Sequence, residues 1–172
     1  MIPNFKFKIS NFKSKGFIFL EILIATALIS IVFITLLGLA FLSLNISSLI
    51  QKTTQADSLV KEELEALRSF RDGTTWSTNG LGAVNTGSGN PYHLILGPVP
   101  TEWILVSGTE TVDIFSRNII FDKVSRDTST NDIENVYNVS NDDPNTRKVT
   151  VNIAFNNKTY QVVNYLTNWQ NK

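Results

Sequence analysis

The stretch KGFIFLEILIATALISIVFITLLGLAFLSL, residues 15–44, decides the fold of this chain. Between Phe17 and Leu44 its only charged residue is Glu21. A helix needs about 20 apolar residues to cross the hydrocarbon core of a bilayer, so residues 17–44 are expected to form a membrane-spanning helix. A carboxylate inside such a segment is costly, which makes Glu21 a candidate functional residue.

Residues 1–16 form a basic segment with no acidic residue; its four lysines are Lys6, Lys8, Lys13 and Lys15. A basic leader that ends in Gly16, followed by Phe17 and by Glu21 at the fifth position of an apolar helix, resembles type IV prepilins and type II secretion pseudopilins. In that family a prepilin peptidase cuts after the glycine, and the new N-terminal residue is methylated. The resemblance implies cleavage between Gly16 and Phe17, methylation of Phe17, and a role for Glu21 as the assembly carboxylate. Many members have Thr, Leu and Ile between the Phe and the Glu; residues 18–20 here are Ile, Phe and Leu, which keep the apolar character.

Two other interpretations of this N-terminus stay open. A basic start before an apolar run is also typical of a secretory signal peptide, and Ala25-Thr26-Ala27 offers a small-residue cleavage pattern. However, the apolar run continues to Leu44, which is too long for a signal peptide. A plain membrane anchor, held with its lysines in the cytoplasm, explains everything except Gly16-Phe17 and Glu21.

The helical pattern continues beyond the apolar run. Apolar residues recur at spacings of four and three through residues 45–72, at Ala56, Val60, Leu64 and Leu67, and so mark one face of a helix. No proline interrupts residues 17–71, and Gly73 supplies a stop. We therefore expect residues 45–72 to be an amphipathic continuation of the first helix, with one face covered by a sheet.

Residues 73–172 are expected to form a globular β-sheet domain. Residues 73–91 are rich in Gly, Ser, Thr and Asn and predict a loop, with Trp76 as its large apolar anchor. Alternation of polar and apolar residues predicts strands at 93–96, 103–107, 111–124, 147–155 and 159–167, the third of them bent or broken near Asn118. Residues 126–147 are polar and predict a long connection at the sheet edge. The expected fold class is α+β, a long N-terminal helix packed on an antiparallel sheet, which is the pilin-like arrangement that the resemblance implies.

Composition limits the function classes further. The formal net charge is zero, but without residues 1–16 the chain has 11 basic and 15 acidic residues, which argues against a nucleic-acid-binding surface. There is no Cys and one His, His93, so no disulfide, zinc–thiolate site or catalytic triad is expected. We expect no enzyme activity, no cofactor and no small-molecule substrate. The acidic residues of the polar connection, Asp127, Asp132, Asp142 and Asp143, leave calcium binding open, although a solvated loop is favoured.

The sequence thus predicts a minor pilin or pseudopilin, a structural subunit of a type IV pilus-like or type II secretion filament. Its expected partners are other such subunits, the prepilin peptidase and methyltransferase, and the membrane. It is expected to cross the cytoplasmic membrane once, with the C-terminal domain outside the cytoplasm, before it enters a filament. The alternative is a membrane-anchored binding module for adhesion, DNA uptake or secreted cargo.

Overall fold

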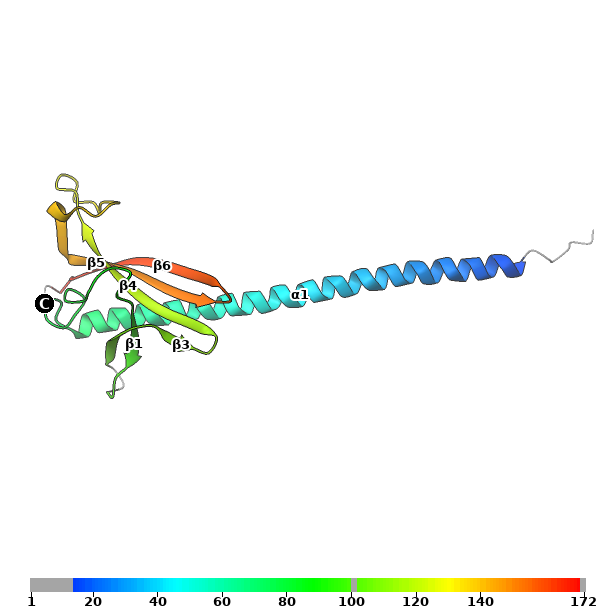
Figure 1. Cartoon of the computed structure of the whole chain (residues 1–172), viewed down its shortest axis with the longest axis horizontal. Helices are drawn as coiled ribbons and strands as arrows, with labels where there is room; N and C mark the ends of the chain where they lie inside the picture. The colour runs from blue at the N-terminus through cyan, green and yellow to red at the C-terminus, as the bar shows by residue number, and fades with distance from the viewer. Residues whose placement is uncertain (1–13, 100–101, 171–172) are drawn as a thin grey trace, which may run out of the picture. The chain divides into compact units, whose positions relative to one another are not determined.

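The structure, a computed structural model, describes residues 14–99 and 102–170. The chain divides into two compact units, Met1–Gln51 and Lys52–Lys172. Within the described residues lie one long helix, six strands and one short 3-10 helix (Figure 1). In chain order these are α1 (Ser14–Gly73), β1 (Tyr92–Leu96), β2 (Trp103–Ser107), β3 (Glu110–Val112), β4 (Phe115–Ser125), η1 (Val139–Asn141), β5 (Asp142–Phe155) and β6 (Lys158–Thr167).

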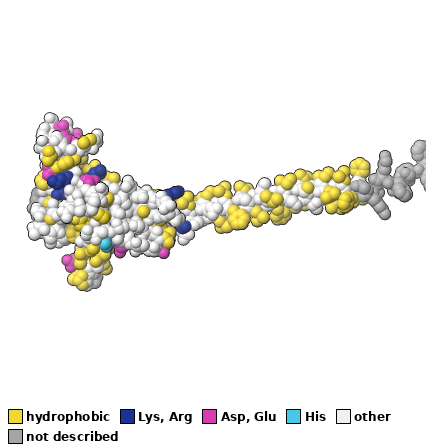
Figure 2. Space-filling model, viewed as in Figure 1, with side chains coloured by type: hydrophobic (Ala, Val, Ile, Leu, Met, Phe, Trp, Pro, Cys, Tyr) yellow, Lys and Arg dark blue, Asp and Glu magenta, His cyan; other side chains and the backbone are white. Residues whose placement is uncertain are grey.

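Helix α1 has 60 residues, as the proline-free sequence predicts. In the first unit its large apolar side chains, from Phe17 to Ile50, are exposed, and Figure 2 shows hydrophobic side chains along this part of the helix. The helix is long and apolar enough to cross a membrane. It ends at Gly73 as predicted, and the Thr74 hydroxyl donates to the Phe70 carbonyl (2.8 Å), which satisfies one of the free carbonyls of the last turn.

The sheet lies entirely in the second unit. Its strand order is β2-β1-β4-β5-β6, with β3 paired to β4, and every pairing is antiparallel. The β5–β6 hairpin is closed by Asn156 and Asn157, both with positive φ, between the paired residues Phe155 and Lys158. Two-residue turns of this kind match the twist of the flanking strands and favour Asn.

The core of the second unit forms between the last part of α1 and one face of this sheet. The buried helix residues include Ala56, Val60 and Leu67, three of the four predicted positions. In β4 every second residue is buried from Phe115 to Phe121, and the same alternation places apolar residues of β5 against the helix. The fold is therefore α+β, with a long N-terminal helix packed on a six-stranded antiparallel sheet, as expected.

The predicted break in the third strand was misplaced. The expected strand 111–124 breaks at Asp113-Ile114, where Asp113 has φ of 54° and a tight turn joins β3 to β4. Asp tolerates this left-handed backbone because its short polar side chain can bond locally. Asn118, the predicted break, instead lies inside β4 opposite Asn152.

The polar connection is also shorter than the predicted 126–147, because β5 begins at Asp142. The pairing of β4 with β5 shifts register between Lys123 and Val124, and Val124 then pairs with Asp143. Pro144 lies at this irregularity, ahead of Thr146 where pairing with β6 starts. A proline, which has no N–H to donate, is tolerated at such a bulge.

Candidate functional site

The first turns of α1 bring the predicted site residues together. Gly16 and Phe17 lie within the helical backbone, and Glu21 follows one turn later. Phe17 and Glu21 are separated by four residues, so their side chains are neighbours on one face of the helix. Leu20, Ile24, Ala25 and Leu28 share this surface with them.

Hydroxyl side chains in the apolar part of α1 find partners within the helix. Thr26 donates to the Leu23 carbonyl (3.0 Å), Ser30 to the Thr26 carbonyl (2.7 Å) and Thr35 to the Val32 carbonyl (2.8 Å). Such back-bonding lets a hydroxyl enter an apolar environment without an unmet hydrogen bond. Glu21 differs, since a carboxylate has no proton to donate and makes no ion pair within the described part of the chain. The site therefore presents one acidic group on an exposed apolar helix surface.

A second cluster of charged residues joins α1 to the sheet. Arg117 of β4 is 5 % exposed and its Nη1 lies 3.2 Å from Glu63 Oε2 and 3.2 Å from Glu62 Oε1. Its Nε donates to Glu110 Oε2 of β3 at 2.6 Å. Glu63, 1 % exposed, accepts a hydrogen bond from the Leu94 N–H of β1 (3.0 Å) through its other oxygen. Together, these contacts of Arg117 and Glu63 join a helix and three strands.

Burial and charge pairing shift the pKa values of Glu63 and Arg117 in opposite directions. Burial raises the pKa of Glu63 above its ordinary value, and the Arg117 charge and the Leu94 N–H offset only part of that rise. For Arg117, burial acts to lower the pKa, but Glu63, Glu110 and Glu62 outweigh it and the net shift is upward. The sequence does not reveal this pair, because Glu63 lies with Glu62 and Glu65 in a run that is typical of a solvated helix face. The available signal was the four-residue spacing, since Glu63 lies three residues from Val60 and four from Leu67 on the predicted apolar face.

The carboxylates of Asp127 and Asp143 are engaged in internal contacts. Asp127 Oδ1 accepts from the N–H groups of Ser129 (2.8 Å) and Thr130 (2.9 Å), which lowers its pKa. Burial acts to raise the pKa of Asp143, but hydrogen bonds from Thr146, Arg126 and the Asn145 N–H lower it on balance. In residues 14–99 and 102–170, no three His, Cys, Asp or Glu side chains come together where they could hold a metal ion.

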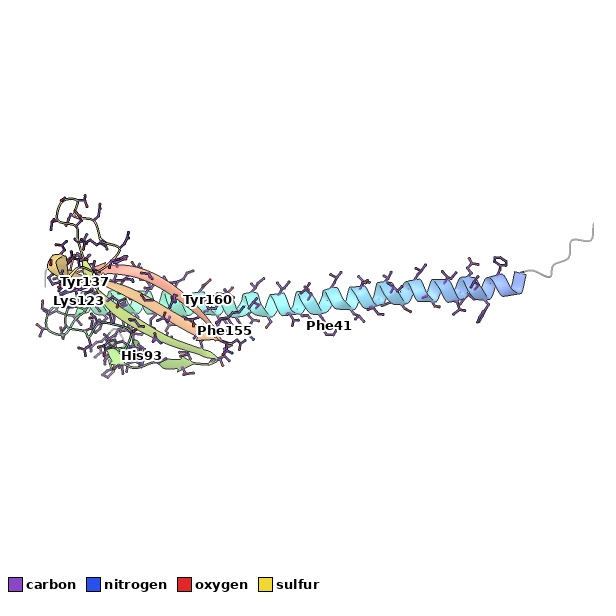
Figure 3. The ribbon with its side chains drawn as sticks, turned by 45° about the horizontal axis from the view of Figure 1, so that its top comes forward. Phe41, His93, Lys123, Tyr137, Phe155 and Tyr160 are labelled. Carbon is purple, nitrogen blue, oxygen red and sulfur yellow. The ribbon has the colours of Figure 1, made fainter. Side chains whose placement is uncertain are left out.

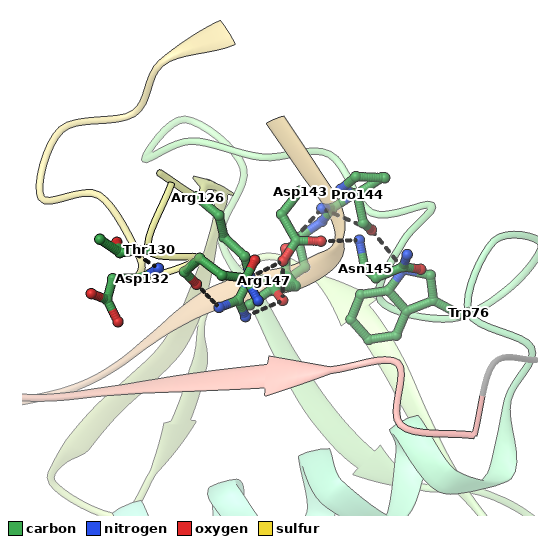
Figure 4. Close-up of polar contacts among 10 residues, drawn as sticks. Trp76, Arg126, Thr130, Asp132, Asp143, Pro144, Asn145 and Arg147 are labelled. Atoms are coloured by element: carbon green, nitrogen blue, oxygen red, sulfur yellow. Dashed lines mark hydrogen bonds and ion pairs between the residues drawn. The ribbon is translucent and has the colours of Figure 1, made fainter. Parts of the chain in front are cut away.

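Figure 4 shows how the start of β5 is fixed to the loop after α1. Within this region, Arg126 Nε donates to Asp143 Oδ2 (2.6 Å). Arg147 Nη2 donates to the Gly82 carbonyl (2.9 Å). Trp76 Nε1 donates to the Pro144 carbonyl (2.9 Å). Trp76 is buried, so the predicted anchor of the 73–91 loop is confirmed. Its hydrogen-bond partner, Pro144, lies at the register shift between β4 and β5, which the sequence did not reveal.

Comparison with known proteins adds no further assignment. No family model, curated protein or solved structure matches the chain. The function must therefore be argued from its own residues.

Proposed function

We propose that this chain is a structural subunit, a minor pilin or pseudopilin, of a type IV pilus-like or type II secretion filament. A membrane peptidase removes residues 1–16, the new N-terminus at Phe17 is methylated, and the mature chain passes from the cytoplasmic membrane into the filament. The observation that carries this proposal is Glu21, the only charged residue between Phe17 and Leu44 and one turn beyond the Gly16-Phe17 bond.

The physical argument rests on the cost of burying that carboxylate. A charged side chain at the centre of a bilayer costs at least about 3 kcal/mol, and more where it cannot reach water. Cleavage after Gly16 creates an amine at Phe17 that stays protonated after methylation. In a filament core of low dielectric, the Glu21 carboxylate of an incoming subunit can pair with the Phe17 amine of a neighbour. Such pairing offsets much of the burial cost, whereas removal of one partner leaves an unpaired charge.

A local pair is the main rival explanation. Glu21 lies one turn from Phe17 and could accept a hydrogen bond from the amine of its own chain. A negative group near a helix N-terminus is also stabilised by the helix dipole. The local pair predicts that Glu21 affects the stability of the single subunit, whereas the intersubunit pair predicts an effect on assembly alone.

The Gly16-Phe17 bond is suited to cleavage in one further respect. It lies in the first turn of α1, and glycine is about 1 kcal/mol less favourable than alanine inside a helix. Local unwinding, which a peptidase needs to reach the backbone, is therefore easier at Gly16 than at the large apolar residues that follow it.

The test combines mass analysis with a matched pair of variants in cells that assemble the filament. The membrane-extracted protein is expected to begin at Phe17 with one added methyl group. Glu21→Val should be cleaved and stable in the membrane but absent from sheared filaments. Thr26→Val, which removes another polar group from the same stretch, should enter filaments normally because Thr26 bonds only to its own helix.

Each result against this expectation has a distinct meaning. A mature protein that starts at Met1 or after Ala27 contradicts the prepilin assignment. Glu21→Val at wild-type levels in filaments removes the intersubunit role. An uncleaved Glu21→Val protein assigns Glu21 to peptidase recognition instead.

A further inference from the structure

The second unit also carries a groove at one end of its sheet. It has a volume of about 350 Å³ and is lined by the ends of β4, β5 and β6, by the loop that follows β4, and by Thr86-Gly87. Its floor is a row of three residues paired across the strands, Asp122, Lys148 and Tyr165. These residues alternate with the buried ones, so they lie on the sheet face that points away from the core.

The walls of the groove are held by hydrogen bonds within the chain. The Glu134 N–H donates to the Ser125 carbonyl (2.9 Å), and the Asn138 N–H donates to the Ser125 hydroxyl (2.9 Å). On the other side, the Gly87 N–H donates to the Phe121 carbonyl (2.7 Å). The register shift at Lys123 and Val124 lies between these walls, and bulges of this kind re-aim side chains at sites. The groove is therefore formed before any ligand binds, which lowers the entropic cost of binding.

The charges along the groove are balanced. Two lysines, Lys123 and Lys148, face two acids, Asp122 and Glu134, and Lys148 Nζ lies 3.9 Å from Asp122 Oδ2. A site with balanced charges has no field that attracts a polyanion such as a nucleic acid, or a cation. It offers donors and acceptors side by side, which suits a neutral ligand that carries both.

Two tyrosines supply aromatic surface to the groove. Tyr165 is 43 % exposed and Tyr137 is 40 % exposed, and the Tyr137 hydroxyl donates to Asp142 Oδ1 (3.0 Å). Figure 3 labels Tyr137 and Lys123 at the same end of the sheet. A tyrosine ring presents an apolar face with little conformational freedom to lose on binding. Aromatic faces beside carboxylate and ammonium groups match the alternating C–H and O–H surfaces of a sugar ring.

We propose that this groove binds a neutral saccharide of one or two rings. Asp122 accepts hydrogen bonds from sugar hydroxyls, Lys123 and Lys148 donate to them, and Tyr165 packs on the ring. The volume is at the small end of the range for ligand sites and fits a short saccharide better than an extended chain. The proposal does not depend on the filament assignment, because the groove belongs to the second unit alone.

The test is ligand-observed saturation-transfer NMR on the full chain in a zwitterionic detergent, since glycoside detergents would compete. The probes are glucose, galactose, N-acetylglucosamine and their β-linked disaccharides, with sialyllactose and acetyl-triglycine amide as charged and peptide comparisons. Saturable binding of at least one neutral sugar is expected. Asp122→Ala should weaken it at least about tenfold, because it removes a charged hydrogen-bond acceptor.

Tyr165→Ala serves as the second variant, and Gln161→Ala is the matched control on the same strand and face but outside the groove. Tyr165→Ala should abolish saturation transfer to the sugar ring protons, while Gln161→Ala should bind as the wild type does. Circular dichroism checks that each variant is folded. The proposal is overturned if no neutral sugar shows saturable binding at a sugar concentration 20 times a Kd of about 1 mM. Binding of sialyllactose or the peptide alone, or an undiminished response in Asp122→Ala and Tyr165→Ala, also overturns it.

Discussion

The buried ion pair between Arg117 and Glu63 offers the sharpest test of the fold. Arg117→Met keeps a long, flexible side chain in the core but removes the charge. Glu63, 1 % exposed, then keeps only the Leu94 N–H as a partner. Breaking a buried pair from one side leaves an uncompensated charge, so we expect the free energy of unfolding to fall by about 3–5 kcal/mol at pH 8.

The other contacts of Arg117 add little to this loss. Glu62 and Glu110 keep 52 % and 30 % of their side-chain surface exposed, and water can solvate them once Arg117 is gone. Exposed pairs of this kind contribute about 0–1 kcal/mol. The prediction therefore depends on Glu63, and adding Glu63→Gln to Arg117→Met should restore part of the lost stability because it removes the unpaired charge.

The effect should also depend on pH. The pKa of Glu63 lies above its ordinary 4.5 in the folded chain, so its contribution to stability falls as pH rises from 4.5 through the folded pKa. Without Arg117 this pKa rises further, because the main charge that lowers it is lost. The cost of Arg117→Met should therefore be largest at pH 8 and should shrink toward pH 4, where the carboxyl is protonated.

The assay is urea unfolding of the full chain in detergent, followed by tryptophan fluorescence. All three tryptophans lie in the second unit, so the signal reports on the sheet and the helix residues packed on it. Arg68→Met is the matched control, because it removes an exposed i, i+3 pair with Glu65 on α1, the helix that carries Glu63. It should lower the free energy of unfolding by less than about 0.5 kcal/mol. Equal losses for Arg117→Met and Arg68→Met, or a loss that does not change with pH, would refute the reasoning.

Three further predictions concern the second unit. A fragment of residues 43–172 should be soluble and monomeric by size-exclusion chromatography with a mixed helix and sheet circular dichroism spectrum; aggregation without that spectrum would contradict the fold. Gly82→Ala should lower the free energy of unfolding by about 1–3 kcal/mol, because the new Cβ would lie 2.7 Å from the Trp76 carbonyl oxygen, whereas Gly89→Ala, with open space around it, should be neutral in the same urea titration. Asp143→Asn should cost about 1–3 kcal/mol at pH 7 in urea unfolding. Because the pKa of Asp143 is lowered, that loss should disappear as pH falls through the folded pKa, and a loss that persists at acid pH would contradict the assignment.

The long helix and the strands could be predicted because their signals are local. A proline-free run with an apolar face at Ala56, Val60 and Leu67 can form only a helix that packs along that side. Residues 148–155 alternate strictly, and the Asn156-Asn157 turn fixes the pairing that follows. In each case the chain carries the information within a few residues.

What could not be predicted depends on partners far apart in sequence. The Glu63–Arg117 pair joins residues 54 positions apart, and the pairing register that places Glu63 near β1 is set only when the sheet forms. The early start of β5 follows from a register shift that neighbouring residues do not encode. The sugar-binding groove is the same kind of feature, since Asp122, Lys148 and Tyr165 become a row only through strand pairing.

Two of the carboxylates of α1, Glu63 and Glu21, show how one physical requirement leads to different solutions. Glu63 is buried, and the chain itself supplies its partners, Arg117 and the Leu94 N–H. Glu21 lies in the most apolar part of the same helix, and no described residue supplies an ion pair there. A carboxylate that stays ionised in a medium of low dielectric needs an opposite charge, and under the proposed cleavage after Gly16 that charge comes from the chain's own amine or from another molecule. In the proposed filament subunit, the own-chain amine would be available to every copy in the membrane, whereas the amine of a neighbour would be available only during assembly. If Glu21→Val leaves the membrane-bound subunit intact and prevents assembly, the neighbour is the partner. Only a correctly placed neighbour then offsets the free-energy cost of burying Glu21.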